Sequence, residues 1–428
     1  METNHTMQAC TNLSQKLTQL SFIQSECTIY KVHSHLRNIN IRAYEPEVIS
    51  IGPYHFDKDN LKMMEDHKLR YLHLLLQHKN DNIEKYVSTI GTLEQEARKC
   101  YAEPFSLNAT EFIEMLVLDG CFVVELVRKC NMIYLREKND PIFHMDWIIN
   151  SLQRDLMLFE NQIPFFVLCK LFDLIEVPNQ HSRLKYLLLS FFDILYPGKV
   201  YRENSTNGSS SHEIKHLLDL IHSSCRPSID WLDSGQEKND KRKKWRFINS
   251  ATGLREANVK FERNEGVNLF DVRFKDGTMI LAPLTVEDRT ESFLRNLIAY
   301  EQYFQDTGQS NFVTDYVKFL DCLIDSSRDV EILSRCGIID NWLGDNEVVA
   351  NMFNKLTDSV AGPGNDFIYA EIFDSVNKHC NKRRNRWVAK LRRNYLNSPW
   401  AVISILVAVV LLLLTVTQTV FSVLQVVV

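Results

Sequence analysis

The sequence predicts a mainly α fold with a small β-element (α+β), in which a helical body is followed by one C-terminal transmembrane helix. Three observations support this prediction: apolar residues recur at three- and four-residue intervals, one central stretch is β-rich, and the C-terminal end is apolar and uncharged. The chain has 428 residues, of which 45% are hydrophobic, 14 are Gly and 11 are Pro. This composition excludes a collagenous or wholly disordered chain.

The helical body follows from hydrophobic periodicity in the first half of the chain. Residues 57–79 place Leu61, Met64, Lys68, Tyr71, Leu72 and Leu75 on one helical face. Residues 110–130 are apolar nearly all round, which predicts a helix in the middle of the core. Further helices are predicted over 143–159, 164–176 and 183–196.

The pattern changes in the second half of the chain. The stretches VKFER, NLFDVRF and TMILAP alternate or are β-rich, and Asp276-Gly277 supplies a two-residue hairpin turn. We therefore expect a β insertion near 245–286, and helical periodicity resumes from about residue 288. Polar residues over 203–212 and 226–246 predict exposed loops.

The C-terminal end predicts membrane attachment. Eight Lys and Arg residues lie between 378 and 393, and no Asp or Glu follows residue 377. Because a helix needs roughly 20 apolar residues to cross a bilayer, we expect a basic juxtamembrane helix over 378–398 and a transmembrane helix over 399–421. Anionic lipids would attract the basic segment. The positive flank predicts a single-pass, tail-anchored protein of the plasma membrane with its body in the cytosol.

An alternative topology places the body outside the cell. Five Asn-x-Ser/Thr triplets, the acceptor pattern for N-glycosylation, begin at Asn4, Asn12, Asn108, Asn204 and Asn207. Such triplets are common by chance in loops rich in Asn and Ser, so the charge asymmetry carries more weight than they do.

Four regions follow from these patterns. They are an N-terminal tail (1–28), a helical domain with the β insertion (29–377), the basic segment (378–398) and the predicted span (399–421). The formal net charge of −5 averages a basic end with a body of 41 basic and 54 acidic residues. The negative charge of the body repels the phosphates of nucleic acids, so we expect no nucleic acid partner. The partners that remain are membrane lipids and an unknown protein.

The cysteines predict free thiols in a reducing compartment. The chain has 10 of them, and no two are close enough for the CxxC pairs of zinc or redox sites. Most lie in apolar stretches, which is typical of buried thiols, and a disulfide framework is not expected for a chain of this length.

One motif resembles a catalytic site. His212, Glu213 and His216 form H-E-x-x-H, in which two His one helical turn apart bind zinc and the Glu activates water. His222 has the spacing of a third ligand, but Asp219 stands where that motif requires a Gly for the chain to turn back. In a continuous helix, His222 would point about 80° away from His212. We therefore assign no metal, cofactor or catalytic residue.

Two acidic residues lie inside apolar runs, where burial could raise a carboxyl pKa and permit acid-base chemistry. They are Asp119 in MLVLDGCFVVEL and Glu160 in LMLFENQIPFFV. The structural interpretation, a buried cap or hydrogen-bond network, is the one we prefer. Cys121 would need a neighbouring His to act as a nucleophile. A hydrolase built on these carboxylates or on the His212 cluster stays open as the alternative function.

Several blocks resemble a plant family called domain of unknown function 247. These blocks, in order, are YEPEVISIGPYH, LKMMEDHKLRYL, MLVLDGCFVVELV, DLMLFENQIPFFVL, ATGLREANVKF, LTVEDRTESFLRNLIAYEQ and DVEILSRCGIIDNWLG. The resemblance covers about nine tenths of the chain, from about Ile29 onward. It implies a membrane-associated plant protein without an established catalytic activity. Some grass members of the family are associated with pollen-side self-incompatibility recognition.

The family blocks have structural interpretations of their own. Gly52-Pro53 predicts a fixed turn that positions Tyr54 and His55 before the next helix. Asn161 and Gln162 stand where side chains can satisfy free N–H groups at a helix start. Together with the C-terminal pattern, the resemblance implies a membrane-anchored, non-enzymatic recognition or signalling protein, of the self-incompatibility type, that acts through protein–protein interaction. A third hypothesis is a tethered transcription regulator released by cleavage before residue 399.

Overall fold

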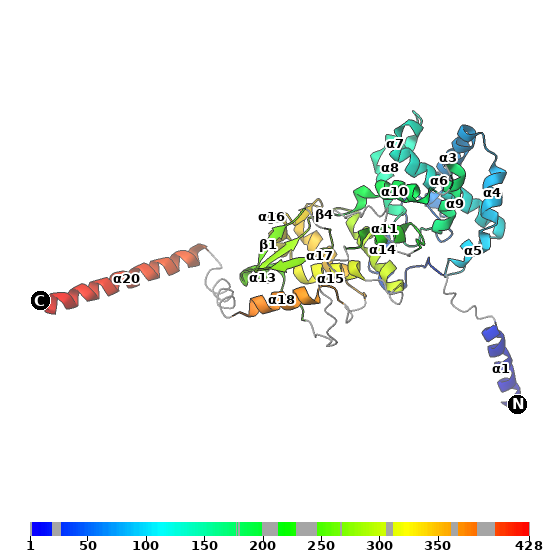
Figure 1. Cartoon of the computed structure of the whole chain (residues 1–428). Helices are drawn as coiled ribbons and strands as arrows, with labels where there is room; N and C mark the ends of the chain where they lie inside the picture. The colour runs from blue at the N-terminus through cyan, green and yellow to red at the C-terminus, as the bar shows by residue number, and fades with distance from the viewer. Residues whose placement is uncertain are drawn as a thin grey trace. The chain divides into compact units, whose positions relative to one another are not determined.

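The computed structural model describes residues 2–18, 27–176, 178, 180–198, 213–227, 246–265, 268–304, 311–360, 367–382 and 399–427 (Figure 1). The chain divides into two compact units. Unit 1 is Met1–Arg226, Glu287–Thr314 and Asp358–Ala361, and unit 2 is Pro227–Val286, Asp315–Thr357 and Gly362–Val428. The described residues are mostly helical with small sheets, which confirms the prediction of a mainly α fold with a small β-element.

Unit 1 is built around α6 (Ala109–Asn131). A capping box starts this helix: Asn108 Oδ1 accepts from the N–H of Glu111, whose carboxylate accepts from the N–H of Asn108. Asn108, which begins one predicted glycosylation triplet, is therefore a helix cap. Because α6 is apolar nearly all round, other helices pack on several of its faces (Figure 1). They include α3 (Met63–Lys79), α4 (Ile83–Gly91), α9 (Phe165–Ile175) and α10 (His181–Phe191).

The other elements of unit 1 follow in chain order. They are α1 (Glu2–Thr18), α2 (Ser34–Arg37), η1 (Ile41–Ala43), η2 (Asp59–Leu61), α5 (Glu94–Lys99), η3 (Ile133–Leu135), α7 (Pro141–His144), α8 (Asp146–Asp155), η4 (Asp193–Leu195), α11 (Leu217–Cys225) and α14 (Thr290–Tyr303). The helices predicted over 143–159 and 183–196 are thus shorter than expected, because each gives way to a turn or a 3-10 helix.

Unit 2 contains the predicted β insertion. β2 (Arg273–Lys275) and β3 (Thr278–Leu281) form the expected hairpin, with Lys275 opposite Thr278. Asp276 and Gly277 both have positive φ, as the tight hairpin turn requires. β1 (Lys260–Arg263) joins the other side of β3 in parallel, so the sheet order is β1-β3-β2. A second sheet pairs β4 (Leu284–Val286) in parallel with β5 (Ile339–Asn341).

The remaining helices are α13 (Ala251–Glu256), α15 (Phe312–Leu323), α16 (Ser327–Arg335), α17 (Asn346–Leu356), α18 (Ala370–Asn381) and α20 (Pro399–Val427). Within unit 2, α16 packs against α13, α17 and β5, and α18 packs against β2. Asp329, at the start of α16, accepts from the N–H of Thr252 at 2.7 Å and so joins α16 to α13.

The C-terminal prediction requires a correction. Residues 399–427 do form a helix, α20. However, no helix in the part of the chain that the structure describes is long and apolar enough to cross a membrane, so the predicted transmembrane helix over 399–421 is wrong. The physical reason is composition: the apolar run from Ala401, which Ser404 interrupts, ends at Leu414, and Thr415, Thr417, Gln418 and Thr419 follow, which leaves less than the roughly 20 apolar residues a span needs.

Some predictions fall on residues that the structure does not describe. They concern Asn204, Asn207, the polar stretch 203–212 with His212, most of 226–246, and the basic segment 378–398 from residue 383 onward.

Candidate functional site

Three of the sequence blocks meet inside unit 1. We call this place the block junction and define it as residues 48–55, Asp119 and residues 160–164. Its centre is Gly52, whose N–H donates to Asp119 Oδ2 at 2.8 Å. Gly52 has a φ of +78°, and an added Cβ would lie 2.3 Å from the carbonyl oxygen of Gln162. Only glycine therefore fits between the other two blocks.

A buried ion pair closes one side of the block junction. The Lys68 ammonium donates to Asp119 Oδ1, to the Ser50 carbonyl oxygen and to Glu65 Oε1, each at 2.6 Å. Burial raises the pKa of Asp119 to about 6, although the Lys68 ammonium opposes this shift. Burial also acts to lower the pKa of Lys68, but the carboxylates of Asp119 and Glu65 outweigh it and raise that pKa. Asp119 is therefore the anionic half of an ion pair at neutral pH.

Side-chain amides satisfy the backbone of the 48–55 segment. Asn161 Oδ1 accepts from the N–H of Ile51 at 2.7 Å, and its Nδ2 donates to the carbonyl oxygen of Ile49 at 3.1 Å. Gln162 Nε2 donates to the carbonyl oxygens of Leu156 and Leu158 at 2.9 and 2.8 Å. The prediction that both amides satisfy free N–H groups at a helix start is confirmed only for Gln162, whose Oε1 accepts from the N–H of Leu218 in the first turn of α11 at 3.3 Å. Asn161 binds a loop instead, and α9, the helix that follows Pro164, has no side-chain cap.

Glu160 anchors a different set of groups. Its Oε1 accepts from the N–H of Val32 and from the Arg37 guanidinium, both at 2.7 Å. His55 Nε2 lies 3.3 Å from Glu160 Oε2, an electrostatic contact without the alignment of a hydrogen bond. Burial lowers the pKa of His55. Burial would raise the pKa of Glu160, but His55 and Arg37 outweigh it and hold that pKa below its usual value.

An N-terminal segment lies across this site, and we call residues 27–33 the strap. The N–H groups of Thr28 and Ile29 both donate to the carbonyl oxygen of Cys100 at 2.9 Å. Ile29 forms a parallel β-bridge with Tyr101. Tyr303 on α14 completes the attachment, because its hydroxyl donates to the Lys31 carbonyl oxygen at 2.8 Å and accepts from the His33 N–H at 3.0 Å.

The residues of the H-E-x-x-H motif do not form a zinc-binding turn. Helix α11 begins only at Leu217, so Glu213 precedes it and His216 is its N-cap, with Nδ1 accepting from the N–H of Asp219 at 3.3 Å. His222 Nε2 instead contacts Glu301 Oε1 at 2.9 Å. Among the described residues, no group of three or more His, Cys, Asp or Glu could hold a metal ion. His212 lies outside those residues.

Glu301 explains where His222 points. Its carboxylate accepts from the N–H groups of Val313 and Thr314 at 3.0 and 2.7 Å, which are free donors in the first turn of α15. The carboxylate therefore caps one helix and binds a His from another. Asp219 is engaged in a similar way, since its two oxygens accept from the Tyr300 hydroxyl at 2.6 Å and the Lys215 N–H at 2.7 Å.

The buried carboxylates of the block junction, and Asp219 beside α14, belong to structural networks. Asp119, Glu160 and Asp219 each accept hydrogen bonds from a backbone N–H, and each has a second polar partner. Cys121 is fully buried, and burial raises its pKa, which keeps the thiol protonated. Sequence reasoning missed Lys68 and Arg37 as partners of these carboxylates, because their separations of 51 and 123 residues leave no local signal.

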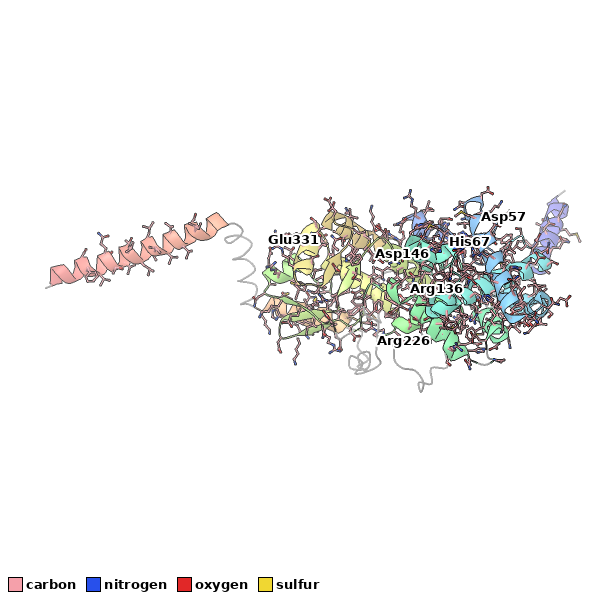
Figure 2. All side chains as sticks on the ribbon, turned by 90° about the horizontal axis from the view of Figure 1, so that it is seen from above. Asp57, His67, Arg136, Asp146, Arg226 and Glu331 are labelled. Carbon is pink, nitrogen blue, oxygen red and sulfur yellow. The ribbon has the colours of Figure 1, made fainter. Side chains whose placement is uncertain are left out.

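Unit 1 also has large apolar side chains that are exposed to solvent. We call Ile133, Tyr134, Trp147, Tyr186 and Ile194 the aromatic surface; they are 72%, 81%, 53%, 65% and 63% exposed. They stand on η3, α8, α10 and η4, and Arg136 and Asp146 mark the first two of these segments in Figure 2.

Hydrogen bonds join the segments of the aromatic surface. Asn131 Nδ2 donates to the Leu187 carbonyl oxygen at 3.1 Å, which holds the end of α6, just before η3, against α10. Gln153 Nε2 donates to the Phe191 carbonyl oxygen at 2.6 Å, which holds α8 against the end of α10, just before η4. The five side chains therefore belong to neighbouring segments of one unit.

The fold and the block junction define a mainly helical protein whose sequence blocks are held together by buried ion pairs and amides. The chain belongs to the family described as plant protein of unknown function (DUF247), whose model matches residues 29–414. This confirms the resemblance seen in the sequence.

Two relatives from Arabidopsis thaliana are similar over most of their length. The chain is 32% identical to "UPF0481 protein At3g47200" over 427 residues, covering 94% of this chain and 87% of the relative. It is 23% identical to "Putative UPF0481 protein At3g02645", covering 96% and 93% of the two chains. No solved structure matches the chain.

Proposed function

We propose that this protein is a non-enzymatic recognition or signalling protein that binds another protein through the aromatic surface of unit 1. The observation that carries the proposal is the exposure of Tyr134, Trp147 and Tyr186, at 81%, 53% and 65%, on neighbouring segments. Trp and Tyr are the residue types that most often dominate binding energy in protein interfaces. They combine a large apolar area with a polar group that can bond at the rim.

The partner that fits this surface is a folded protein with apolar pockets. An exposed Trp or Tyr contributes most binding energy where a pocket of the partner removes it fully from water. A folded protein surface provides such pockets. The rigidity of the supporting helices favours the same partner class, because α10 and α8 are held to their neighbours by the bonds of Asn131 and Gln153. Little conformational entropy is then lost on binding.

The state of the buried carboxylates is consistent with a binding role. Asp119 is paired with Lys68, and Glu160 is held by Arg37 and Val32, so each stabilises the arrangement of the sequence blocks. A general acid or base must instead reach the substrate. The block junction serves, in this proposal, to fix the helices that display the aromatic surface.

Co-purification from plant tissue tests the proposal. The full chain is expressed with a tag as wild type, as the double variant Tyr134→Ala/Trp147→Ala, and as Trp342→Ala. Trp342 is the matched control, since it is 69% exposed but belongs to unit 2. We expect the double variant to recover at least about tenfold less of a specific partner, while the control recovers as much as the wild type. Equal recovery with both variants would contradict the proposal.

A further inference from the structure

We propose that Cys27 and Cys100 form a disulfide bond under oxidising conditions and that this bond locks the strap onto unit 1. Both residues carry thiols in the structure and are partly exposed. The Cys27 Sγ lies 3.5 Å from the carbonyl oxygen of Lys99 and 3.9 Å from that of Tyr101, so it sits beside the backbone of Cys100. This proximity joins residues 73 positions apart, which the sequence spacing does not suggest.

A backbone hydrogen bond brings the two cysteines close together. The Thr28 N–H donates to the Cys100 carbonyl oxygen at 2.9 Å. The Thr28 nitrogen is two covalent bonds from the Cys27 Cα, and the Cys100 oxygen is two bonds from the Cys100 Cα. Standard bond lengths then keep the two Cα atoms within roughly 8 Å of each other. Disulfides need about 4.4–6.8 Å between these atoms. The Ile29–Tyr101 bridge holds the two segments parallel just beyond the pair.

One side-chain rotation completes the geometry. Cys100 Sγ now donates to the carbonyl oxygen of Glu96 at 3.5 Å, one helical turn back along α5. Rotation about χ1 of Cys100 releases this weak bond and turns the sulfur toward Cys27. Thiol bonds to backbone oxygens are weak, so this bond opposes the rotation only slightly.

The oxidant for Cys27 and Cys100 is a small-molecule disulfide, glutathione disulfide. The thiolate of one cysteine attacks a sulfur of glutathione disulfide and expels one glutathione as a thiolate, which leaves a mixed disulfide on the protein. The thiolate of the second cysteine attacks the protein sulfur and expels the second glutathione. Two protein thiols thus lose two protons and two electrons, and one glutathione disulfide is reduced to two molecules of glutathione.

The consequence lies in what the strap contacts. It supplies the Val32 N–H to Glu160, at 2.7 Å, and the Lys31 carbonyl oxygen to Tyr303. In the reduced protein, hydrogen bonds and side-chain packing hold the strap at its first residues. In the oxidised protein a covalent bond closes a loop between residues 27 and 100, which removes conformational freedom from the unfolded chain.

Peptide mapping tests the crosslink. The full chain, carrying Cys10→Ser to remove one exposed thiol, is equilibrated with glutathione disulfide, alkylated and digested with a glutamyl protease. Cleavage after Glu111 separates Cys100 from Cys121. We expect a peptide pair joined through Cys27 and Cys100, and the same pair in a Cys336→Ser control. Recovery of Cys27 or Cys100 only as a glutathione adduct, or a different crosslink, would overturn the proposal.

A stability measurement gives the second readout. Oxidation is expected to raise the Tm on the order of 5–10 °C in the chain with both cysteines. It should leave the Tm of Cys27→Ser and of Cys100→Ser within about 1 °C of the reduced value. A similar rise in all three chains would show that another pair of cysteines is responsible, and no rise in any of them would overturn the locking of the strap.

Discussion

The Lys68 ammonium lies 2.6 Å from Oδ1 of Asp119, and both side chains are only 2% exposed. Removing one partner leaves the other charge buried, which is costly. We therefore expect Lys68→Met to lower the free energy of unfolding by about 3–5 kcal/mol. Lys62→Met is the control, because Lys62 is 53% exposed and pairs with exposed carboxylates, so its loss should change the free energy of unfolding far less. Urea unfolding measures both; comparable losses would contradict the structural role of the pair.

Gly52 tests the close approach of two sequence blocks. Gly52→Ala places a Cβ 2.3 Å from a backbone oxygen at a φ of +78°, whereas Gly344→Ala has a φ of +83° and no atom within 4 Å. The control variant isolates the backbone cost of about 1–2 kcal/mol. We expect the loss in Gly52→Ala to exceed it by at least about 2 kcal/mol, because the clashing atom is backbone and must shift. Hydrogen exchange of amides in each unit measures the two losses, and equal losses would rule out the clash.

Asp155 tests how the 47–49 backbone is held. Its carboxylate accepts from the N–H groups of Glu47, Val48 and Ile49 at 2.7–3.0 Å and is fully buried. Asp155→Ala leaves these donors without that acceptor, which we expect to cost at least about 3 kcal/mol. Asn82→Ala removes an exposed N-cap with one donor and should cost about 1 kcal/mol. Urea unfolding compares the two; a loss in Asp155→Ala no larger than in Asn82→Ala would be the contrary result.

His216 predicts a pH dependence of stability. Burial lowers its pKa to about 4 in the folded chain, against about 6.5 when unfolded. Between these values the unfolded state binds more protons, so stability falls as the pH falls from about 6.5 to 4, by about 3 kcal/mol in total.

The variant His216→Asn keeps an N-cap acceptor but does not titrate. From pH 6.5 to pH 4 we expect this variant to lose about 3 kcal/mol less of its free energy of unfolding than the wild type loses. Urea unfolding at several pH values measures the difference. Parallel pH curves for the two proteins would show that His216 does not contribute.

The parts of the fold that local sequence specifies were predictable. The apolar surface of residues 110–130 indicates a central helix, and α6 spans Ala109–Asn131. Asp276-Gly277 indicates a tight hairpin, and β2 and β3 form it. Gly52-Pro53 indicates a fixed turn, and Gly52 has a positive φ there. Each of these features depends on a few adjacent residues and on their periodicity or backbone preference.

Features that depend on distant residues were not predictable. Tertiary contacts set the parallel pairing of β1 with β3 and the position of the short strand β5. The sequence has no turn motif that predicts either of them. Lys68 was placed on the apolar face of its helix, but its carboxylate partner lies 51 residues away. The end of the chain shows the opposite error, because apolar composition alone indicated a span that α20 does not provide.

The affinity for a purified partner tests the central claim most directly. The partner is the protein recovered with the wild-type chain, and its dissociation constant is measured for wild type, Trp147→Ala and Trp342→Ala. If the aromatic surface of unit 1 is the binding site, Trp147→Ala weakens binding at least about tenfold. Trp342→Ala then changes the affinity less than about twofold. Wild-type affinity in Trp147→Ala would contradict the account.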